Sequence, residues 1–341
     1  MAAPNSEFDS KVTTINQQQS SSSSSLISSI LINSFKFSLS QENPQKPNFE
    51  TFQLFSSSSG SGFGFDDVSQ KVNVIPPPPC VEVLASDSKV PLFGKPKFES
   101  VDFDGVTLFK GRVNTQQVFG LSNSDLVPGK YEGGLKLWEG SLDLIKALRS
   151  EIKTELISFG GKRVLEIGCG HGLPGIYSLL EGGSVVHFQD FNAEVLQSLT
   201  IPNLNANFFE KSQSSLSPSA NNVPEVRFFA GDWSEVDKLL LQVGTDAKHN
   251  EVSSGYDFIL MAETVYSINS LQSLYNLIKK CLIHPHGVVY MAAKKHYFGV
   301  GGGSRRFLSV VEKDGVMTSK LVAEITDGSS NVREVWKLTF K

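Results

Sequence analysis

The chain has 341 residues, of which 40% are hydrophobic and 19% are charged, and its formal net charge is −4. This length allows one large or two modest domains, and the hydrophobic fraction is enough for a buried core. Because the sequence has no basic block, it argues against a general nucleic-acid binder. Its three cysteines are too widely spaced for a disulfide framework or a zinc site and fit a reducing compartment. No apolar run is long enough to cross a bilayer, so we expect a soluble intracellular protein.

The first part of the chain differs in composition from the rest. Residues 17–25 are glutamines followed by serines, residues 56–64 are rich in serine and glycine, and residues 76–79 are four prolines. Such segments bury too little apolar surface to offset the entropy of ordering, so we predict a mostly disordered tail over residues 1–95. The apolar stretch 26–39 has no acidic residue, as in a transit peptide, but it also has no arginine. We therefore favour a tail or docking segment over a targeting signal.

A lead segment over residues 96–160 is predicted to precede the main domain. Residues 101–110 alternate apolar and polar side chains and indicate a hairpin that turns near Asp104 and Gly105. A helix is predicted over residues 141–156, with Ser141 as its N-cap. Its expected buried stripe consists of Leu142, Ile145, Leu148, Ile152 and Leu156. Trp138 precedes this helix, where it either packs in the core or closes over a ligand.

The most informative stretch is RVLEIGCGHGLPG, residues 163–175. A short apolar strand over residues 164–167 runs into Gly168, Gly170 and Gly172, and a helix-compatible segment follows over residues 173–180. A strand, a glycine turn and a helix N-terminus together form a nucleotide-binding unit. The glycines are spaced G-x-G-x-G with Glu166 two positions before the first, which differs from the G-x-G-x-x-G of dinucleotide sites.

The next two predicted strands each end in an acidic residue. Residues 185–190 end at Asp190, about twenty residues past the glycine turn, where a carboxylate accepts hydrogen bonds from both ribose hydroxyls. His187, on the same strand, is interpreted as structural. The strand over residues 226–230 is followed by Asp232 and Trp233. Asp232 is also a suitable N-cap for a helix near residues 236–241.

The remaining chain continues the alternation of strands and helices. A helix over 193–207 leads to a polar surface loop at 211–224, and a fourth strand over 256–262 ends at Glu263 and Tyr266. Open α/β sheets place their chemistry at the carboxyl ends of parallel strands, so these two residues are expected at the mouth of the site. The other predicted elements are a helix at 268–281, a strand at 287–293, a helix at 304–313 and a closing antiparallel strand pair at 316–326 and 332–340.

The glycine pattern with Glu166 resembles motif I of the seven-strand methyltransferases that depend on S-adenosylmethionine. Four stretches together resemble the histidine protein methyltransferase family: residues 135–144, 164–183, the E-x-x-Y of residues 263–266, and AAKKHYFGVGGG at 292–303. The resemblance covers about residues 101–341, and its most specific element is the last stretch. It implies an α/β fold, namely a Rossmann-like seven-stranded sheet with helices on both faces, whose methyltransferase domain spans residues 161–341.

The resemblance also implies a reaction and roles for particular residues. It implies S-adenosyl-L-methionine as the cofactor, a histidine ring nitrogen of a large-subunit ribosomal protein as the acceptor, and no metal. Glu263 and Tyr266 are expected to be catalytic, and His296 is expected to structure its loop. The residues expected to bind the cofactor are Trp138, Glu139, Glu166, Gly168, Gly170, Asp190, Asp232 and Trp233.

Other functions remain open, and the sequence also leads to expectations about partners and location. The alternatives are a methyltransferase that acts on protein lysine or on a small molecule, and a non-catalytic, cofactor-binding scaffold for ribosome assembly. We expect a monomer in the cytoplasm and nucleus that contacts a protein substrate, without membrane association or sequence-specific binding of nucleic acid.

Overall fold

The computed structural model describes residues 77–88, 97–103, 105–122, 124–212, 223–242, 255–326, 328 and 331–341. Most of the predicted tail, its apolar stretch at 26–39 and most of the loop at 211–224 lie outside these residues. The strands are β1 (Val81–Val83), β2 (Phe98–Phe103), β3 (Val106–Gly111), β4 (Arg163–Ile167), β5 (Val185–Asp190), β6 (Glu225–Ala230), β7 (Phe258–Ala262), β8 (Val288–Lys294), β9 (Met317–Ile325) and β10 (Arg333–Phe340). The helices are α2 (Thr115–Phe119), α3 (Glu139–Lys153), α4 (Leu173–Leu180), α5 (Ala193–Val195), α6 (Ile201–Ser212), α7 (Asp237–Gln242), α8 (Leu271–Cys281) and α9 (Ser304–Asp314).

The main sheet has the strand order β1-β6-β5-β4-β7-β8-β10-β9. Strands β6, β5, β4, β7 and β8 are parallel, whereas β10 is antiparallel to both β8 and β9. The order reverses at β4, since β5 lies on one side of it and β7 on the other. In an open α/β sheet this reversal creates a crevice at the carboxyl ends of the strands. The predicted α/β class, the parallel strands and the antiparallel closing pair are confirmed.

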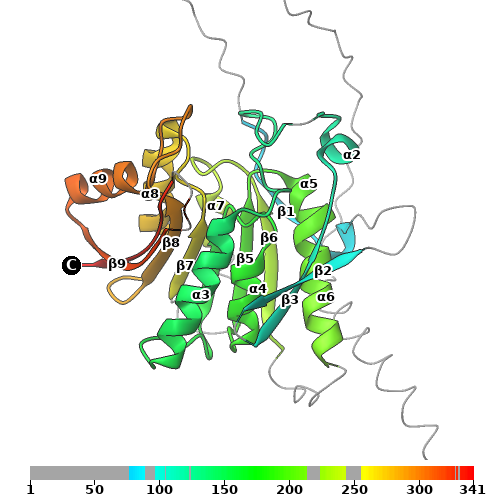
Figure 1. Cartoon of the computed structure of the whole chain (residues 1–341), viewed down its shortest axis with the longest axis horizontal. Helices are drawn as coiled ribbons and strands as arrows, with labels where there is room; N and C mark the ends of the chain where they lie inside the picture. The colour runs from blue at the N-terminus through cyan, green and yellow to red at the C-terminus, as the bar shows by residue number, and fades with distance from the viewer. Residues whose placement is uncertain are drawn as a thin grey trace, which may run out of the picture. The chain divides into compact units, whose positions relative to one another are not determined.

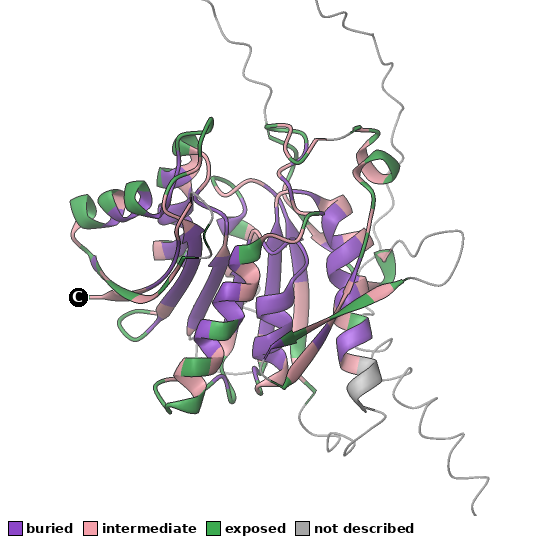
Figure 2. Ribbon diagram, in the orientation of Figure 1, coloured by how far each residue is buried: buried purple, intermediate pink, exposed green. Residues whose placement is uncertain are grey.

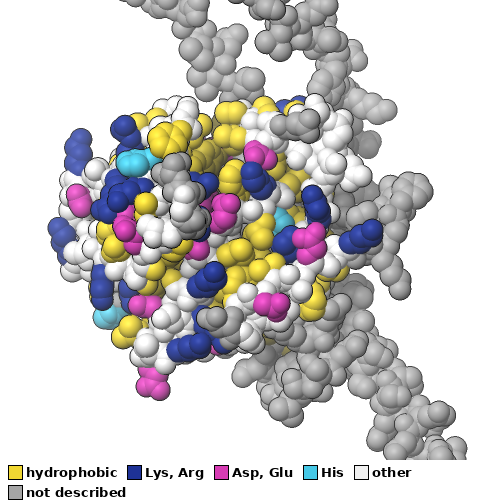
Figure 3. Space-filling model, viewed as in Figure 1, with side chains coloured by type: hydrophobic (Ala, Val, Ile, Leu, Met, Phe, Trp, Pro, Cys, Tyr) yellow, Lys and Arg dark blue, Asp and Glu magenta, His cyan; other side chains and the backbone are white. Residues whose placement is uncertain are grey.

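Helices cover both faces of the sheet, with α3, α4 and α6 on one face and α7, α8 and α9 on the other (Figure 1). Neighbouring strand residues point to opposite faces, so Val164 packs against the layer of α3, α4 and α6, and Leu165 packs against the layer of α7, α8 and α9. Both faces are buried (Figure 2), which explains why the strands are almost continuously apolar. Basic and acidic side chains are interspersed over the face shown in Figure 3.

The predicted hairpin forms a separate two-stranded sheet, β2–β3, that lies across α6 (Figure 1). Two asparagines of α6 hold it. Asn203 accepts the Gly111 N–H at 2.6 Å, and Asn207 accepts the Phe109 N–H at 2.8 Å. Asn203 also donates to the carbonyl of His171, at 2.9 Å. The hairpin is therefore tied through one helix to the turn that follows β4.

The start and the end of α3 both differ from the prediction. The helix begins at Glu139 with Trp138 as its N-cap, so Ser141 lies inside the first turn and does not cap it. The helix ends at Lys153, and Glu155 adopts a left-handed φ of +58°. Leu156 is consequently turned out of the buried stripe and is 62% exposed. The other four predicted stripe residues do contact the core.

The predicted tail over residues 1–95 contains a strand of the main sheet, which is a correction to that boundary. Val81–Val83 form β1, which is antiparallel to β6 and lies at the edge of the sheet. Glu82 accepts hydrogen bonds from two nitrogens of Arg227, both at 2.7 Å, across this pair. No helix in the described part of the chain is long and apolar enough to span a membrane.

Candidate active site

The turn after β4 requires glycine for two reasons. Gly168, Gly170 and Gly172 have φ values of +60°, +50° and +71°, in the left-handed region that side chains disfavour. A Cβ atom on Gly170 would also lie 2.9 Å from the carbonyl oxygen of Gly134, and one on Gly168 would lie 2.7 Å from Cγ2 of Thr264. The turn is therefore packed between the lead segment and the residues that follow β7.

A pocket of about 890 Å³ opens beside this turn. It is enclosed by the lead segment, the glycine turn and the residues at the carboxyl ends of β5, β6 and β7. Eight residues predicted as site residues lie in its lining: Trp138, Gly168, Gly170, Asp190, Asp232, Trp233, Glu263 and Tyr266. Within the described ranges, no group of three His, Cys, Asp or Glu side chains is arranged to hold a metal ion.

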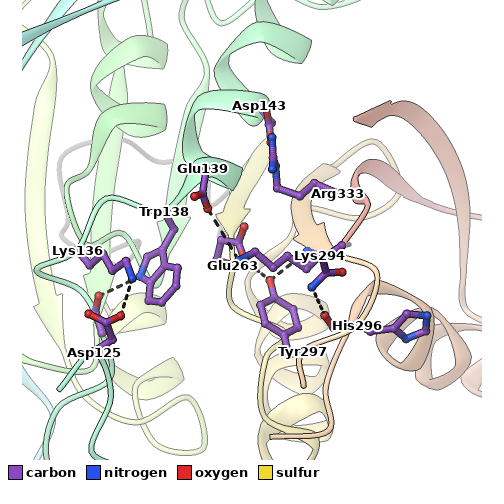
Figure 4. Close-up of polar contacts among 12 residues, drawn as sticks. Asp125, Lys136, Trp138, Glu139, Asp143, Glu263, Lys294, His296, Tyr297 and Arg333 are labelled. Atoms are coloured by element: carbon purple, nitrogen blue, oxygen red, sulfur yellow. Dashed lines mark hydrogen bonds and ion pairs between the residues drawn. The ribbon is translucent and has the colours of Figure 1, made fainter. Parts of the chain in front are cut away.

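Glu166 and Glu139 were predicted to contact the cofactor, and the structure places neither in the pocket lining. Glu166 points toward α4, where its Oε2 accepts the N–H of Gly175 at 2.7 Å. Burial raises the pKa of Glu166 well above its usual value. Glu139 is exposed at the start of α3, with its Oε2 3.9 Å from Nζ of Lys294 (Figure 4). Glu166 thus positions the glycine turn, and Glu139 lies outside the pocket.

Asp190 is buried at the end of β5, and its carboxylate faces the pocket. Its Oδ2 accepts the N–H of Gly170 at 2.9 Å, and its Oδ1 accepts the N–H of Asn192 at 3.0 Å. Burial raises the pKa of Asp190 to about 6, and these two N–H groups partly oppose that rise. Each carboxylate oxygen has a second lone pair, so the residue retains acceptor capacity for a ligand.

Asp232 and Trp233 form the pocket wall that follows β6. Oδ1 of Asp232 accepts both the backbone N–H and the hydroxyl of Ser234, at 2.8 and 2.6 Å. The capping interpretation of Asp232 therefore holds for the turn that precedes α7. Trp233 donates its indole N–H to Oε1 of Gln189 at 3.0 Å, and Gln189 in turn donates to the carbonyl of Gly231 at 2.9 Å. This chain of bonds fixes the indole plane at the pocket.

The lead segment forms the opposite wall. Trp138 donates its indole N–H to the Gly133 carbonyl at 3.1 Å, and the ammonium of Lys136 lies 4.4 Å from its ring centre. Figure 4 shows this indole beside Lys136. Glu132 accepts the Gly129 N–H at 2.6 Å and also accepts the hydroxyl of Tyr266. Glu132 was missed by the sequence analysis, because nothing in the sequence pairs it with a tyrosine 134 positions later.

His171 is a second pocket residue that the sequence analysis did not single out. Its Nε2 lies 3.1 Å from the carbonyl oxygen of Leu135, which assigns the proton to Nε2. Burial lowers the pKa of His171 to about 4, so the ring is neutral at physiological pH. The residue therefore links the glycine turn to the lead segment without adding a charge.

Glu263 is buried where three elements meet. It follows β7 with a left-handed φ of +59°, an uncommon conformation for a residue with a side chain. Its Oε2 accepts the hydroxyl of Tyr297 (Figure 4). Its Oε1 faces Gly140 at the start of α3 and has no hydrogen-bond partner among the described residues. Burial raises the pKa of Glu263, and the Tyr297 hydroxyl opposes this rise.

The loop over residues 295–303 holds the E-x-x-Y segment through backbone bonds. Gly302 donates to the carbonyl of Tyr266 at 2.9 Å, and Gly303 donates to that of Val265 at 2.8 Å. Tyr297 was missed as a site residue, although it lies inside the recognised KHYFGVGGG stretch. His296 is exposed, and its ring points away from Glu263 in Figure 4. Its carbonyl accepts from the amide of Asn331 at 2.7 Å, which agrees with a loop-structuring role.

The strand order and the glycine turn define the class of the protein. Apart from β1, the sheet has the order β6-β5-β4-β7-β8-β10-β9, and β10 runs antiparallel to its two neighbours, β8 and β9. This is the seven-strand methyltransferase arrangement. The pocket lies at the carboxyl ends of β5, β6 and β7, on both sides of the reversal.

Comparisons with known proteins show which proteins the chain is similar to, although no protein-family model matches the chain. A histidine protein methyltransferase 1 homolog of Dictyostelium discoideum is 44% identical over 221 residues, which are 65% of this chain and 62% of the relative. The homolog of Bos taurus is 37% identical, with 64% and 58% covered. EEF1A lysine methyltransferase 3 of Mus musculus is 27% identical, with 47% and 55% covered. The chain is thus similar to the histidine protein methyltransferases, and it spans about three fifths of the length of the two histidine methyltransferase homologs named here.

Proposed function

We propose that the chain is an S-adenosylmethionine-dependent protein methyltransferase that methylates a histidine ring nitrogen in a large-subunit ribosomal protein. The observation that carries the proposal is one pocket lined by the glycine turn, Asp190 and Asp232 on one side and by Glu263 and Tyr266 on the other. Such a pocket brings a nucleoside-type ligand and an acceptor side chain together. The choice of histidine is supported by the similarity to histidine protein methyltransferases.

The residues of the pocket fit this cofactor by their chemistry. Asp190 provides a carboxylate for the ribose hydroxyls, Asp232 provides an acceptor for the amino group of adenine, and Trp233 provides an aromatic surface beside it. The glycine turn lets the ligand approach the backbone closely. A volume of about 890 Å³ also leaves room for an acceptor side chain.

The bound cofactor supplies an electrophilic methyl group, and the residues of the chain position the acceptor and stabilise charge. A histidine acceptor is mostly neutral near pH 7, so it needs no strong base before it attacks. Its ring becomes positively charged as the new bond forms. The buried carboxylate of Glu263 stabilises that charge electrostatically, because a fixed charge acts more strongly where burial lowers the local dielectric.

Tyr266 and Tyr297 keep the acceptor side of the pocket in place. Tyr297 donates to Glu263, and Tyr266 donates to Glu132, so each tyrosine joins the end of β7 to a different part of the chain. Burial raises the pKa of both hydroxyls, which therefore remain donors at physiological pH. In this proposal Tyr266 also orients the acceptor ring.

The proposal is tested by transfer of radiolabelled methyl groups into purified large-subunit ribosomal proteins, followed by acid hydrolysis. We expect the label in methyl-histidine. Label in methyl-lysine would retain the site and change the acceptor, which is the second function that the similarity to a lysine methyltransferase supports. Binding of the cofactor without any transfer would instead support a scaffold. We further propose that the enzyme acts in the cytoplasm and nucleus, as a monomer that contacts its protein substrate.

A further inference from the structure

Three large apolar side chains lie exposed beside the pocket, and we call them the rim patch: Ile268, Phe298 and Val300. Their exposed fractions are 48%, 78% and 38%. Val300 belongs to the pocket lining, as do Ser267, Asn269 and Ser270 next to Ile268. The rim patch is therefore continuous with the pocket.

Backbone bonds hold the rim patch in a fixed place. Ser267 and Gly301 form an antiparallel bridge, which sets the segment with Ile268 beside the segment with Phe298 and Val300. A Cβ atom on Gly301 would lie 3.9 Å from Cγ2 of Ile268, which is ordinary van der Waals contact. Gly302 donates to Tyr266, so the same loop also contacts the E-x-x-Y segment. Apolar side chains that are held in place and exposed next to a pocket are typical of a surface that binds another molecule.

We propose that the rim patch docks the polypeptide segment that carries the acceptor histidine and receives an apolar side chain next to it. The inference rests on the proposed function and deepens it. A small-molecule acceptor would fit inside the pocket and would not need the rim. An acceptor side chain on a protein reaches the pocket only if its own backbone lies across the rim, where Ile268, Phe298 and Val300 are exposed.

The test uses the full chain with Ile268→Ser and Phe298→Ser, singly and together, and purified large-subunit ribosomal proteins as the methyl acceptor. Leu156→Ser is the matched control, because Leu156 is also a large, exposed apolar side chain but follows the end of α3 that lies away from the pocket. We expect KM for the ribosomal proteins to rise about tenfold in the double variant, as for the loss of an anchoring contact. The rate at saturation and the cofactor Kd, measured by calorimetry, should match the unmodified chain.

Each other result overturns the inference in a distinct way. An unchanged KM shows that the rim patch does not contact the substrate. A lower KM shows that the rim patch hinders substrate binding instead of assisting it, and altered sedimentation shows that the patch is an interface between two copies of the chain. If cofactor affinity falls by the same factor as the affinity for the ribosomal proteins, the rim patch supports the structure of the whole pocket and does not bind the substrate specifically. If the unmodified chain neither binds nor methylates these proteins, the proposed function fails too, whereas normal methylation with unaffected variants removes only the docking proposal.

Discussion

Asp190 is the residue whose position followed most directly from the sequence. Its spacing from the glycine turn placed it at the end of β5, and the structure puts its carboxylate in the pocket lining. Glu166 had an equally plausible spacing, but its side chain points into the helix layer and bonds to Gly175. A residue count places a side chain on a strand, whereas its direction depends on which face that residue occupies. The sequence therefore predicted that Asp190 lies at the pocket, whereas the side chain of Glu166 contacts Gly175 outside the pocket lining.

Cofactor affinity should depend on pH through Asp190. The pKa of this carboxyl is raised to about 6 by burial, and hydroxyl donors bind its ionised form better. Affinity should therefore be constant above that pKa and should fall as the pH decreases through it, because a proton must then be lost on binding. Asp190→Asn should weaken binding by about 1–3 kcal/mol and abolish this pH dependence. Calorimetry at several pH values checks both, and an unchanged affinity in the variant would remove Asp190 from the cofactor site.

Glu263→Gln separates binding from chemistry. Glutamine keeps the shape and still accepts from Tyr297, but it removes the negative charge that would stabilise the acceptor ring. We expect methyl transfer to slow by about a hundredfold while cofactor affinity stays nearly constant. The melting temperature should not fall, because burial disfavours the ionised form and raises the pKa of Glu263 in the folded state. Weak cofactor binding with normal turnover at saturation would place Glu263 on the cofactor instead.

At the scale of elements, strands were predicted more accurately than helix ends. The buried parallel strands are short apolar runs bounded by glycine or polar residues, so their positions were readable. The start of α3 was misplaced because Trp138 has no side chain that caps a helix, and a serine two residues inside the helix has one. The contacts of the 295–303 loop were not predictable, since its glycines bond to carbonyls more than thirty residues earlier.

Gly302→Ala tests whether this loop positions the E-x-x-Y segment. A Cβ atom there would collide with the carbonyl oxygens of Val265 and Tyr266, which are backbone atoms that cannot move aside. We expect a loss of methyl transfer of at least about tenfold with a smaller change in cofactor Kd, because the displaced residues lie on the side of the pocket where we propose that the acceptor binds. Gly299→Ala is the control: its φ of +83° adds strain, but no atom lies within 4 Å of the new methyl group. Equal losses in the two variants would show that loop strain alone is responsible.

At the scale of the whole molecule, the resemblance predicted the seven strands and their arrangement, but not the eighth strand, β1. Its three residues, Val-Glu-Val, follow a proline run and resemble a linker in composition. In the structure they pair with the edge of β6, Glu82 binds Arg227, and Val83 is buried in the core. Pairing of this kind depends on tertiary contacts that a local sequence pattern does not contain.

Two truncations locate the true start of the folded part. Removal of residues 1–76 leaves β1 in place, whereas removal of residues 1–95 deletes it, exposes the edge of β6 and leaves Arg227 without Glu82. We expect the shorter chain to melt about 2–8 °C below the longer one, which corresponds to a loss of roughly 1–2 kcal/mol in a domain of this size. Glu82→Gln in the full chain isolates the contribution of the ion pair. Calorimetric melting of all four proteins checks the order, and equal melting temperatures for the two truncations would return the domain boundary to residue 95.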